Sequence, residues 1–263
     1  PRRSSDLLSN PTGIRKGGQV QQSATRKDSS SCFSSLSRHA IEFSSVSRLY
    51  PAGSVTALED ITLGVRRGEF LAVVGPSGSG KTTLLNLMSG LDQPTQGSVL
   101  INGAEPESAV KWAWLRARAI GFVFQSFQLL PAFTALENVQ IPMFGVVKSR
   151  AQRLDAAHDL LHRVGLDAKR HRYPDELSSG EKQRVAIARS LANSPSILLA
   201  DEPTGNLDSR SSEAVMHLLQ DLSRAKRLTL VVVTHNHAIA RDADRVVELF
   251  DGRIASLTEK GGL

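Results

Sequence analysis

Cysteine is nearly absent from this 263-residue chain. Its one cysteine, Cys32, has no second thiol in the chain with which to form a disulfide, which fits a reducing compartment. No apolar run approaches the roughly 18 residues that would cross a bilayer, and the residues before the cysteine lack the apolar stretch typical of a secretory signal. If a membrane is involved, we expect another subunit to cross it.

Acidic residues are scarce in the first 38 residues, which hold ten serines, seven basic residues and two acidic ones. This segment carries +5 of the total charge of +6, so the remainder is near neutral at about +1. Without apolar periodicity, residues 1–38 are predicted to form a disordered basic tail. Three roles stay open for it: an inert extension, contact with an anionic membrane surface, or organellar targeting. The remainder lacks a basic face interleaved with aromatics, so no nucleic acid partner is expected.

A glycine-rich loop is the strongest motif of the chain, since residues 75–82 fit the phosphate-binding template G-x-x-x-x-G-K-[ST]. An apolar run before it suits a buried strand, and the residues after it can begin a helix. Glycines let the backbone approach phosphates, while N–H groups and the positive helix end face the anion. Lys81 would reach the β- and γ-phosphates, and Thr82 would ligate Mg²⁺. The predicted phosphate-binding residues are Gly75, Ser77, Gly78, Ser79, Gly80, Lys81, Thr82 and Thr83.

Two adjacent carboxylates follow a second apolar run, residues 197–200. The run is typical of a buried central strand, and Asp201 and Glu202 lie at its carboxyl end, where open α/β sheets place their ligands. Asp201 suits the Mg²⁺ shell, and Glu202 suits polarising an attacking water. This pair helps to separate kinases, GTPases and ATPases, which share the phosphate loop.

A serine- and glycine-rich segment, residues 177–181, precedes a run with one apolar helical face. The segment Leu-Ser-Ser-Gly-Glu resembles the signature of ABC ATPases. The resemblance implies that Ser178, Ser179 and Gly180 cap the γ-phosphate held by the opposite subunit, through N–H donors and the helix dipole. Taken alone, Ser178 and Glu181 also fit a simple capping box.

Four further positions match the family in the expected order. Gln125 resembles the glutamine that joins the core to a helical subdomain and touches the metal site. Asp208 resembles part of the loop that crosses the dimer interface, and His235 resembles the switch histidine at the γ-phosphate. Tyr50 lies where the family places a ring under the adenine. The resemblance spans residues 39–257 and implies ATP and Mg²⁺ as cofactors.

The resemblance also assigns chemical roles. It implies that catalysis rests on Glu202, His235 and Gln125, and that Mg²⁺ is held by Thr82, Gln125 and Asp201.

Two positions depart from the family pattern. Ser179 stands where the family usually has glycine, so its Cβ would crowd the facing nucleotide or require a backbone angle open only to glycine. We expect a weakened or slowed site, because Gly180 is retained. Glu181 replaces the common glutamine and still leaves a side chain able to cap the helix.

The expected fold is α/β: a P-loop ABC ATPase fold with a RecA-like core, an antiparallel β subdomain and a helical signature subdomain. The ATPase domain is predicted over residues 39–263, with the helical subdomain at 126–192. Strands are predicted at 39–46, 57–66, 69–74, 98–102, 119–124, 197–201, 228–233 and 245–250. Helices are predicted near 81–90, 109–117, 149–164, 181–192, 210–225 and 237–241.

Three segments, residues 90–97, 127–139 and 200–208, look like the lipoprotein-releasing and macrolide-export type of ABC ATPase. That resemblance implies a homodimer bound to an integral-membrane permease at the cytoplasmic face of the inner membrane. The cell-division ATPase that pairs with a similar permease is the alternative. Four apolar residues are candidates either for the groove that receives the permease or for burial in the helical lobe: Phe127, Leu129, Leu130 and Phe133.

Two other classes stay open. A soluble ABC-type ATPase that acts on nucleic acid or ribosomes usually has two fused ATPase domains or a long coiled-coil insertion, and this sequence shows neither. A scaffold that holds ATP without turnover finds modest support in Ser179. Glu202 and His235 argue against it.

Overall fold

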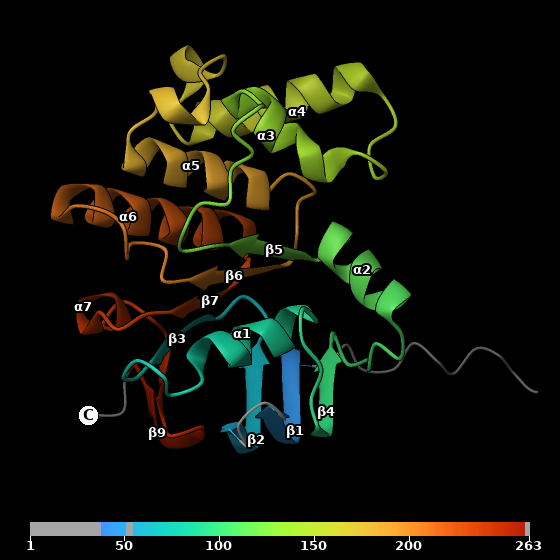
Figure 1. Ribbon diagram of the computed structural model, residues 1–263, viewed down its shortest axis with the longest axis vertical. Coiled ribbons are helices and arrows are strands. Elements are labelled where there is room, and N and C mark those ends of the chain that lie inside the picture. Colours follow the sequence, from blue (N-terminus) through green and yellow to red (C-terminus); the bar gives the residue numbers. More distant parts are fainter. Residues whose placement is uncertain (1–37, 51–54, 261–263) are drawn as a thin grey trace, which may run out of the picture. The chain divides into compact units, whose positions relative to one another are not determined.

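The computed structural model describes residues 38–50 and 55–260 (Figure 1). Its strands are β1 (His39–Tyr50), β2 (Val55–Arg66), β3 (Phe70–Val74), β4 (Gln96–Ile101), β5 (Ile120–Val123), β6 (Ile197–Asp201), β7 (Thr229–Val233), β8 (Arg245–Phe250) and β9 (Arg253–Glu259). Its α-helices are α1 (Lys81–Ser89), α2 (Ala109–Arg118), α3 (Ala135–Gln140), α4 (Arg150–Arg163), α5 (Ser179–Ser190), α6 (Ser209–Lys226) and α7 (His237–Ala240). Short 3-10 helices are η1 (Ile141–Met143), η2 (Asp167–Lys169) and η3 (Pro174–Glu176).

A mixed sheet forms the centre of this part of the chain. Its strand order is β5-β6-β7-β3-β8-β9, and the first five strands run parallel while β9 is antiparallel. Every residue of β3 and of β7 is buried, as expected for strands covered on both faces. The phosphate loop follows an internal strand of the sheet, because β3 lies between β7 and β8.

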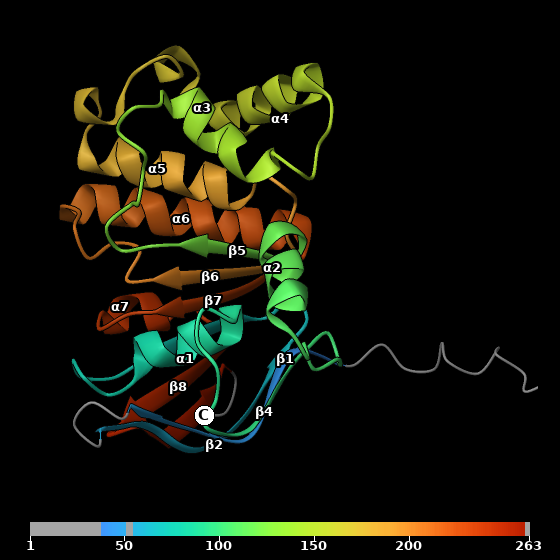
Figure 2. The ribbon, with the colours of Figure 1, turned by 45° about the vertical axis from the view of Figure 1, so that its right-hand side comes forward.

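Alternate residues of the central strands face two separate hydrophobic cores, because side chains of a strand point to opposite faces. Phe70, Ala72 and Val74 belong to a core that includes α5 and α6. Leu71 and Val73 belong to a core that includes α1 and the second sheet. Figures 1 and 2 show the resulting layers, with α5 and α6 on one face of the parallel sheet and α1 on the other.

The second sheet is antiparallel, with strand order β2-β1-β4. Its strand β1 continues to Tyr50, whereas the sequence pattern predicts an end at residue 46. Register shifts follow Phe43 and Val46, and Ser45 has a left-handed φ of 47°. Such bulges break the period-two alternation that a sequence pattern relies on.

The helices α3, α4 and α5 all lie between β5 and β6 in the chain. The sequence patterns do not predict α3, which is only six residues long. Thr134 and Glu137 form a capping box at its start. Asn138 is fully buried, and its Nδ2 donates to the carbonyl oxygens of Phe133 and Thr134 at 2.9 and 3.0 Å. This amide fixes the loop that leads from Gln125 into the helices.

The α/β fold with a parallel core, an antiparallel sheet and a helical region is confirmed. Strand β9 was not predicted, because its residues are mostly exposed and show no apolar alternation. The predicted tail and Cys32 fall outside the described residues, except for residue 38. Within the described ranges, the helices are too short or too polar to cross a membrane.

Candidate functional site

The loop between β3 and α1 has the close backbone packing of a phosphate cradle. A Cβ on Gly75 would stand 2.1 Å from the carbonyl oxygen of Leu249, and one on Gly80 would stand 2.3 Å from that of Ala57. Glycine is therefore required at both positions. Gly78 has a φ of 83°, and nothing lies within 4 Å of where its Cβ would be. The loop thus packs tightly against the backbone of Leu249 and Ala57, and the space beside Gly78 is open.

Lys81 is 8% exposed and bends back over this loop. Its Nζ donates to the carbonyl oxygens of Gly75 and Pro76, at 2.9 and 2.8 Å. The ammonium is therefore already ordered at the cradle. Ser79 Oγ is buried and has no hydrogen-bond partner in the described structure. A buried hydroxyl without a partner points to a ligand that supplies one.

Thr82 and Asp201 face each other, with Thr82 Oγ1 3.4 Å from Oδ1 of Asp201. Burial raises the pKa of Asp201 above its ordinary value of 3.8, because desolvation disfavours the carboxylate. A divalent cation would offset that cost. One hydroxyl and one carboxylate fit Mg²⁺, which usually completes its shell with phosphates and water. The described residues contain no cluster of three or more His, Cys, Asp or Glu able to cage a metal.

Glu202 and His235 form a pair at the ends of adjacent strands. Glu202 Oε1 lies 3.0 Å from His235 Nδ1. Glu202 has a left-handed φ of 44°, and its N–H donates to the carbonyl oxygen of Val233 at 2.9 Å. Its Oε2 is buried and has no hydrogen-bond partner within the described ranges. One carboxylate oxygen is thus held by the imidazole, and the other can accept from a water.

Gln125 follows β5 and lies beside the loop that follows Glu202. Asn206 Nδ2 donates to the backbone oxygen of Gln125 at 2.9 Å. A Cβ on Gly205 would stand 3.0 Å from Gln125 Nε2, so this glycine permits a close approach. Four parallel strands therefore bring the predicted residues to one edge of the sheet, at their carboxyl ends: the phosphate loop, Gln125, Asp201, Glu202 and His235.

The signature segment starts helix α5. Ser178 is its N-cap: Ser178 Oγ accepts from the Glu181 N–H at 3.3 Å, and Glu181 Oε2 accepts from the Ser178 N–H at 3.1 Å. The capping box is confirmed. Ser179 is the first residue of the helix and is exposed, without a positive φ. The concern that position 179 needs an angle open only to glycine is therefore wrong.

Asp208 caps helix α6 beside the signature. Its Oδ1 accepts from the Ser211 N–H at 3.0 Å, and its Oδ2 accepts from Ser211 Oγ at 2.7 Å. The Ser211 N–H lowers the pKa of Asp208, and its hydroxyl adds to the effect. A Cβ on Gly180 would stand 3.1 Å from Ser211 Oγ. Ser211 thus bonds to Asp208 and packs beside Gly180, a position that no sequence motif indicates.

The signature turn and the phosphate loop belong to opposite faces of the sheet. In both views of the ribbon, α6 and the parallel strands lie between α5 and α1 (Figures 1 and 2). The two predicted phosphate-binding segments are therefore separate surfaces within one copy of the chain.

Tyr50 ends β1 in a network with two residues that the sequence analysis did not single out. Its hydroxyl donates to Asp92 Oδ2 at 2.6 Å. Arg48 Nε donates to the same oxygen at 2.9 Å, and the Arg48 guanidinium lies 4.6 Å from the centre of the Tyr50 ring. These contacts fix the plane of the ring. Arg48 and Asp92 carry no motif of their own, and only their contacts identify them.

An apolar groove of about 320 Å³ lies between β5, α5 and η1. The four candidates from the sequence, Phe127, Leu129, Leu130 and Phe133, do not line it. Leu129 packs against the core that includes α5. Leu130 and Phe133 are exposed outside this groove, so their contact with a permease stays a prediction. The sequence analysis did not single out the residues that line the groove. Its apolar residues are Leu91, Ile120, Phe122, Phe124, Ile141 and Pro142.

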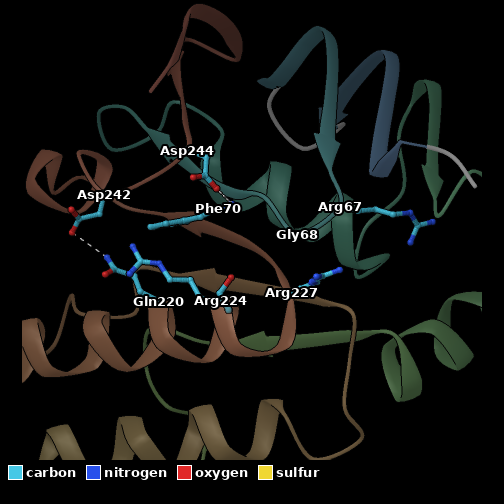
Figure 3. Close-up of a pocket in the computed structure, with 9 residues that line it drawn as sticks. Arg67, Gly68, Phe70, Gln220, Arg224, Arg227, Asp242 and Asp244 are labelled. Atoms are coloured by element: carbon cyan, nitrogen blue, oxygen red, sulfur yellow. Dashed lines mark hydrogen bonds between the residues drawn. The ribbon is translucent and has the colours of Figure 1, made fainter. Parts of the chain in front are cut away.

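A second cavity, of about 490 Å³, lies at the other end of the strands (Figure 3). Phe70, the first residue of β3, lines it, and the N–H of Phe70 donates to Asp244 Oδ2 at 2.8 Å. Gln220 Nε2 donates to Asp242 Oδ2 at 3.1 Å. In Figure 3, Arg67 points away from this polar pair. The cavity lies at the amino end of β3, whereas residues 75–82 follow the carboxyl end of that strand.

Comparison with known proteins agrees with this geometry. The sequence model of the ABC transporter family matches residues 58–205. The lipoprotein-releasing system ATP-binding protein LolD of Syntrophotalea carbinolica is 48% identical over 219 residues, which cover 81% of this chain and 96% of that protein. The macrolide export ATP-binding/permease protein MacB of Nitrosomonas europaea is 45% identical over 221 residues, which cover 82% of this chain and 33% of that protein.

A solved structure shows the same fold. It is a dimeric ATP-binding cassette in a post-hydrolysis state, bound to ADP and Pi, and it is 39% identical with a TM-score of 0.79. The match covers 85% of this chain and all of that one. The chain therefore belongs to the ABC transporter family and is one of its ATP-binding subunits that hydrolyse ATP.

Proposed function

We propose that two copies of this chain enclose ATP between the phosphate loop of one and the signature turn of the other. The arrangement that supports this is the separation of the two surfaces: α5 and α1 cover opposite faces of the parallel sheet. A second copy, turned to face the first, would bring its signature N–H groups to the γ-phosphate. The dimeric cassette that resembles this chain supports the same assembly.

The residues of one half-site divide the chemistry among them. Gly75 to Thr83 bind the phosphates, and Lys81 supplies a fixed positive charge beside them. Glu202 positions the attacking water and accepts its proton through the unpaired Oε2. His235 orients Glu202 and contacts the γ-phosphate. As the water oxygen bonds to the γ-phosphorus, the bond from that phosphorus to the bridging β–γ oxygen breaks, so the products are ADP and inorganic phosphate.

Mg²⁺ would be held by Thr82, Asp201 and Gln125 together with phosphate oxygens. When bound, it neutralises phosphate charge that develops on the leaving group. The Asp201 carboxylate fits this role, because its burial raises its pKa and a cation would offset that desolvation.

Tyr50 is proposed to stack on the adenine. The network with Arg48 and Asp92 holds the ring in one orientation before the nucleotide arrives. A preorganised ring contributes affinity because less side-chain freedom is lost on binding.

We propose that the dimer drives a separate membrane permease of the lipoprotein-release or macrolide-export type. The support is the 48% identity to LolD across nearly the whole of that protein. The apolar groove lined by Leu91, Phe122 and Phe124 suits an amphipathic segment of the permease. ATP-driven closure would move the permease, and hydrolysis would reset it. The chain would then reside at the cytoplasmic face of the inner membrane through protein contact.

Membrane recruitment tests this proposal. Leu91 is 52% exposed in the groove, so Leu91→Asp places a charge there without disturbing the core. When the permease is co-produced, this variant should lose its place in the membrane fraction. The matched control is Leu257→Asp, at a residue that is 46% exposed on the distant strand β9.

Deletion of residues 1–37 is the second arm of the test. We expect recruitment to survive it, because the permease contact would hold the chain. Two results would contradict the exporter proposal. In one, the chain pellets with membranes through residues 1–37 alone; in the other, it fails to pellet with any co-produced permease.

A further inference from the structure

Glu181 brings a negative charge into the first turn of the signature helix. Its Oε2 accepts from the Ser178 N–H, while its Oε1 accepts from Lys169 Nζ at 2.6 Å. The next nearest cation is Arg184, whose Nη2 is 4.0 Å from the same Oε1. Lys169 belongs to η2, ten residues before the signature helix begins at Ser179. The capping carboxylate is therefore paired with a lysine from another element.

The Glu181 carboxylate opposes the proposed binding of the γ-phosphate by residues 178–180. A helix N-terminus attracts an anion through its free N–H groups and its positive dipole end. A carboxylate in the same turn competes for that field and repels a phosphate. A glutamine would fill the same capping position without charge. The charge of Glu181 therefore requires compensation if this turn is to receive the γ-phosphate.

The charge of Glu181 persists at neutral pH. The hydrogen bond from Lys169 lowers the pKa of Glu181, and the Ser178 N–H adds to that effect. Its side chain is only 15% exposed, whereas that of Lys169 is 48% exposed. Water therefore screens the carboxylate less than a surface acid, so the adjacent ammonium matters more.

We propose that Lys169 is a positioning residue of the composite ATP site, which cancels the charge of Glu181 so that the turn from Ser178 to Gly180 can bind the γ-phosphate held by a second copy. The inference rests on the proposed dimer, in which two copies of the chain enclose ATP. It gives Lys169 no contact with the nucleotide of its own copy, because its partner carboxylate caps α5 on the far side of the sheet from the phosphate loop.

The test measures dimerisation driven by Mg-ATP in the Glu202→Gln background, by sedimentation velocity. Lys169→Met should weaken the dimer about tenfold, because Glu181 would keep only the longer 4.0 Å contact with Arg184 and its charge would face the phosphate. The double variant Lys169→Met/Glu181→Gln should restore the parent affinity, because it removes both charges. The single-variant defect should also shrink at high NaCl concentration.

The matched control is Arg172→Met, which breaks an ion pair of the same 2.6 Å length to Glu176 in the same segment. It should dimerise like the parent. A double variant that stays as weak as Lys169→Met would overturn the proposal in favour of a bracing contact between η2 and α5. An unchanged Lys169→Met dimer, or an equal loss in Arg172→Met, would also overturn it. If the Glu202→Gln parent itself does not dimerise, the result contradicts the proposed ATP-enclosing dimer and not the role of Lys169.

Discussion

Two segments of the chain are proposed to bind phosphate through their backbone, and the two are built differently. The loop from Gly75 to Lys81 is held by close backbone contacts, and its lysine is buried and already ordered. The turn from Ser178 to Gly180 is held by a capping box and is largely exposed. One is a backbone cradle with an ordered lysine within a single copy. The other is a helix N-terminus that lines a cavity of about 200 Å³ together with Arg184 and Ser211.

This difference suggests that the two regions have different tasks: the phosphate loop would set the affinity for ATP, and the signature turn would control assembly with a second copy. In the proposed function the phosphate loop would bind a nucleotide without a partner, because Lys81, Thr82 and Asp201 all belong to one copy. The signature turn would contribute only when a second copy closes. Substitutions in the first region should change binding or hydrolysis, and those in the second should change assembly.

The largest expected effect comes from Glu202, which belongs to the first region. Glu202→Gln should keep ATP binding but lower turnover by about a thousandfold, because the water loses its base while the phosphate contacts remain. Phosphate release assays with a parallel binding titration check this. Glu248→Gln, at an exposed position of β8, is the control. Near-native turnover would remove Glu202 from the mechanism.

Removal of the ordered ammonium should come next in size. Lys81→Ala should weaken ATP binding by about thirtyfold, the loss of roughly 2 kcal/mol expected for a charge-assisted contact. Isothermal titration calorimetry measures it, with the exposed Lys111→Ala as control. Unchanged affinity would contradict the role of Lys81.

Asp201 should lower the thermal stability of the nucleotide-free chain while it supports Mg²⁺-dependent ATP binding. Its raised pKa means that the carboxylate destabilises the metal-free fold above its pKa. Asp201→Asn should therefore raise the Tm of the nucleotide-free chain by about 2 °C and abolish the dependence of ATP binding on Mg²⁺. Differential scanning calorimetry with and without Mg-ATP decides. A lower Tm without ligand would show that the charge is compensated by the protein.

Ser179 should have the smallest effect. Its helical backbone removes the conformational penalty, so only crowding of the facing nucleotide remains. Ser179→Gly should raise ATP hydrolysis about twofold. Steady-state rates at saturating ATP measure this, and a fall would mean that the hydroxyl is used.

Sequence patterns predicted the parts of the fold that rest on local rules. The buried runs 70–74 and 229–233 lie in the predicted parallel strands, because full burial leaves a continuous apolar signal. Strand β9 was missed because an exposed edge strand carries no such signal. The end of β1 was misplaced because the bulges near Ser45 interrupt its alternation.

The site shows the same limit. Template spacing identified the loop at Lys81 and the carboxylates at 201–202, because the chemistry fixes those residue types. The pairing of Lys169 with Glu181 and of Tyr50 with Asp92 joins residues 12 and 42 positions apart, and no motif records it. Such contacts arise from tertiary packing, so only the structure reveals them.

The two-surface account is tested most directly by Ser178→Asp in the Glu202→Gln background. Aspartate is itself a good N-cap, so α5 should persist while a negative charge faces the partner's γ-phosphate. Ser149→Asp, the same change at the N-cap of α4, is the control. Sedimentation velocity with fluorescent ATP records bound nucleotide and mass together. The account predicts that Ser178→Asp stays monomeric and binds ATP with the affinity that the parent shows at concentrations too low for dimers, while Ser149→Asp dimerises. Dimers of Ser178→Asp, or loss of ATP binding by its monomer, would contradict it.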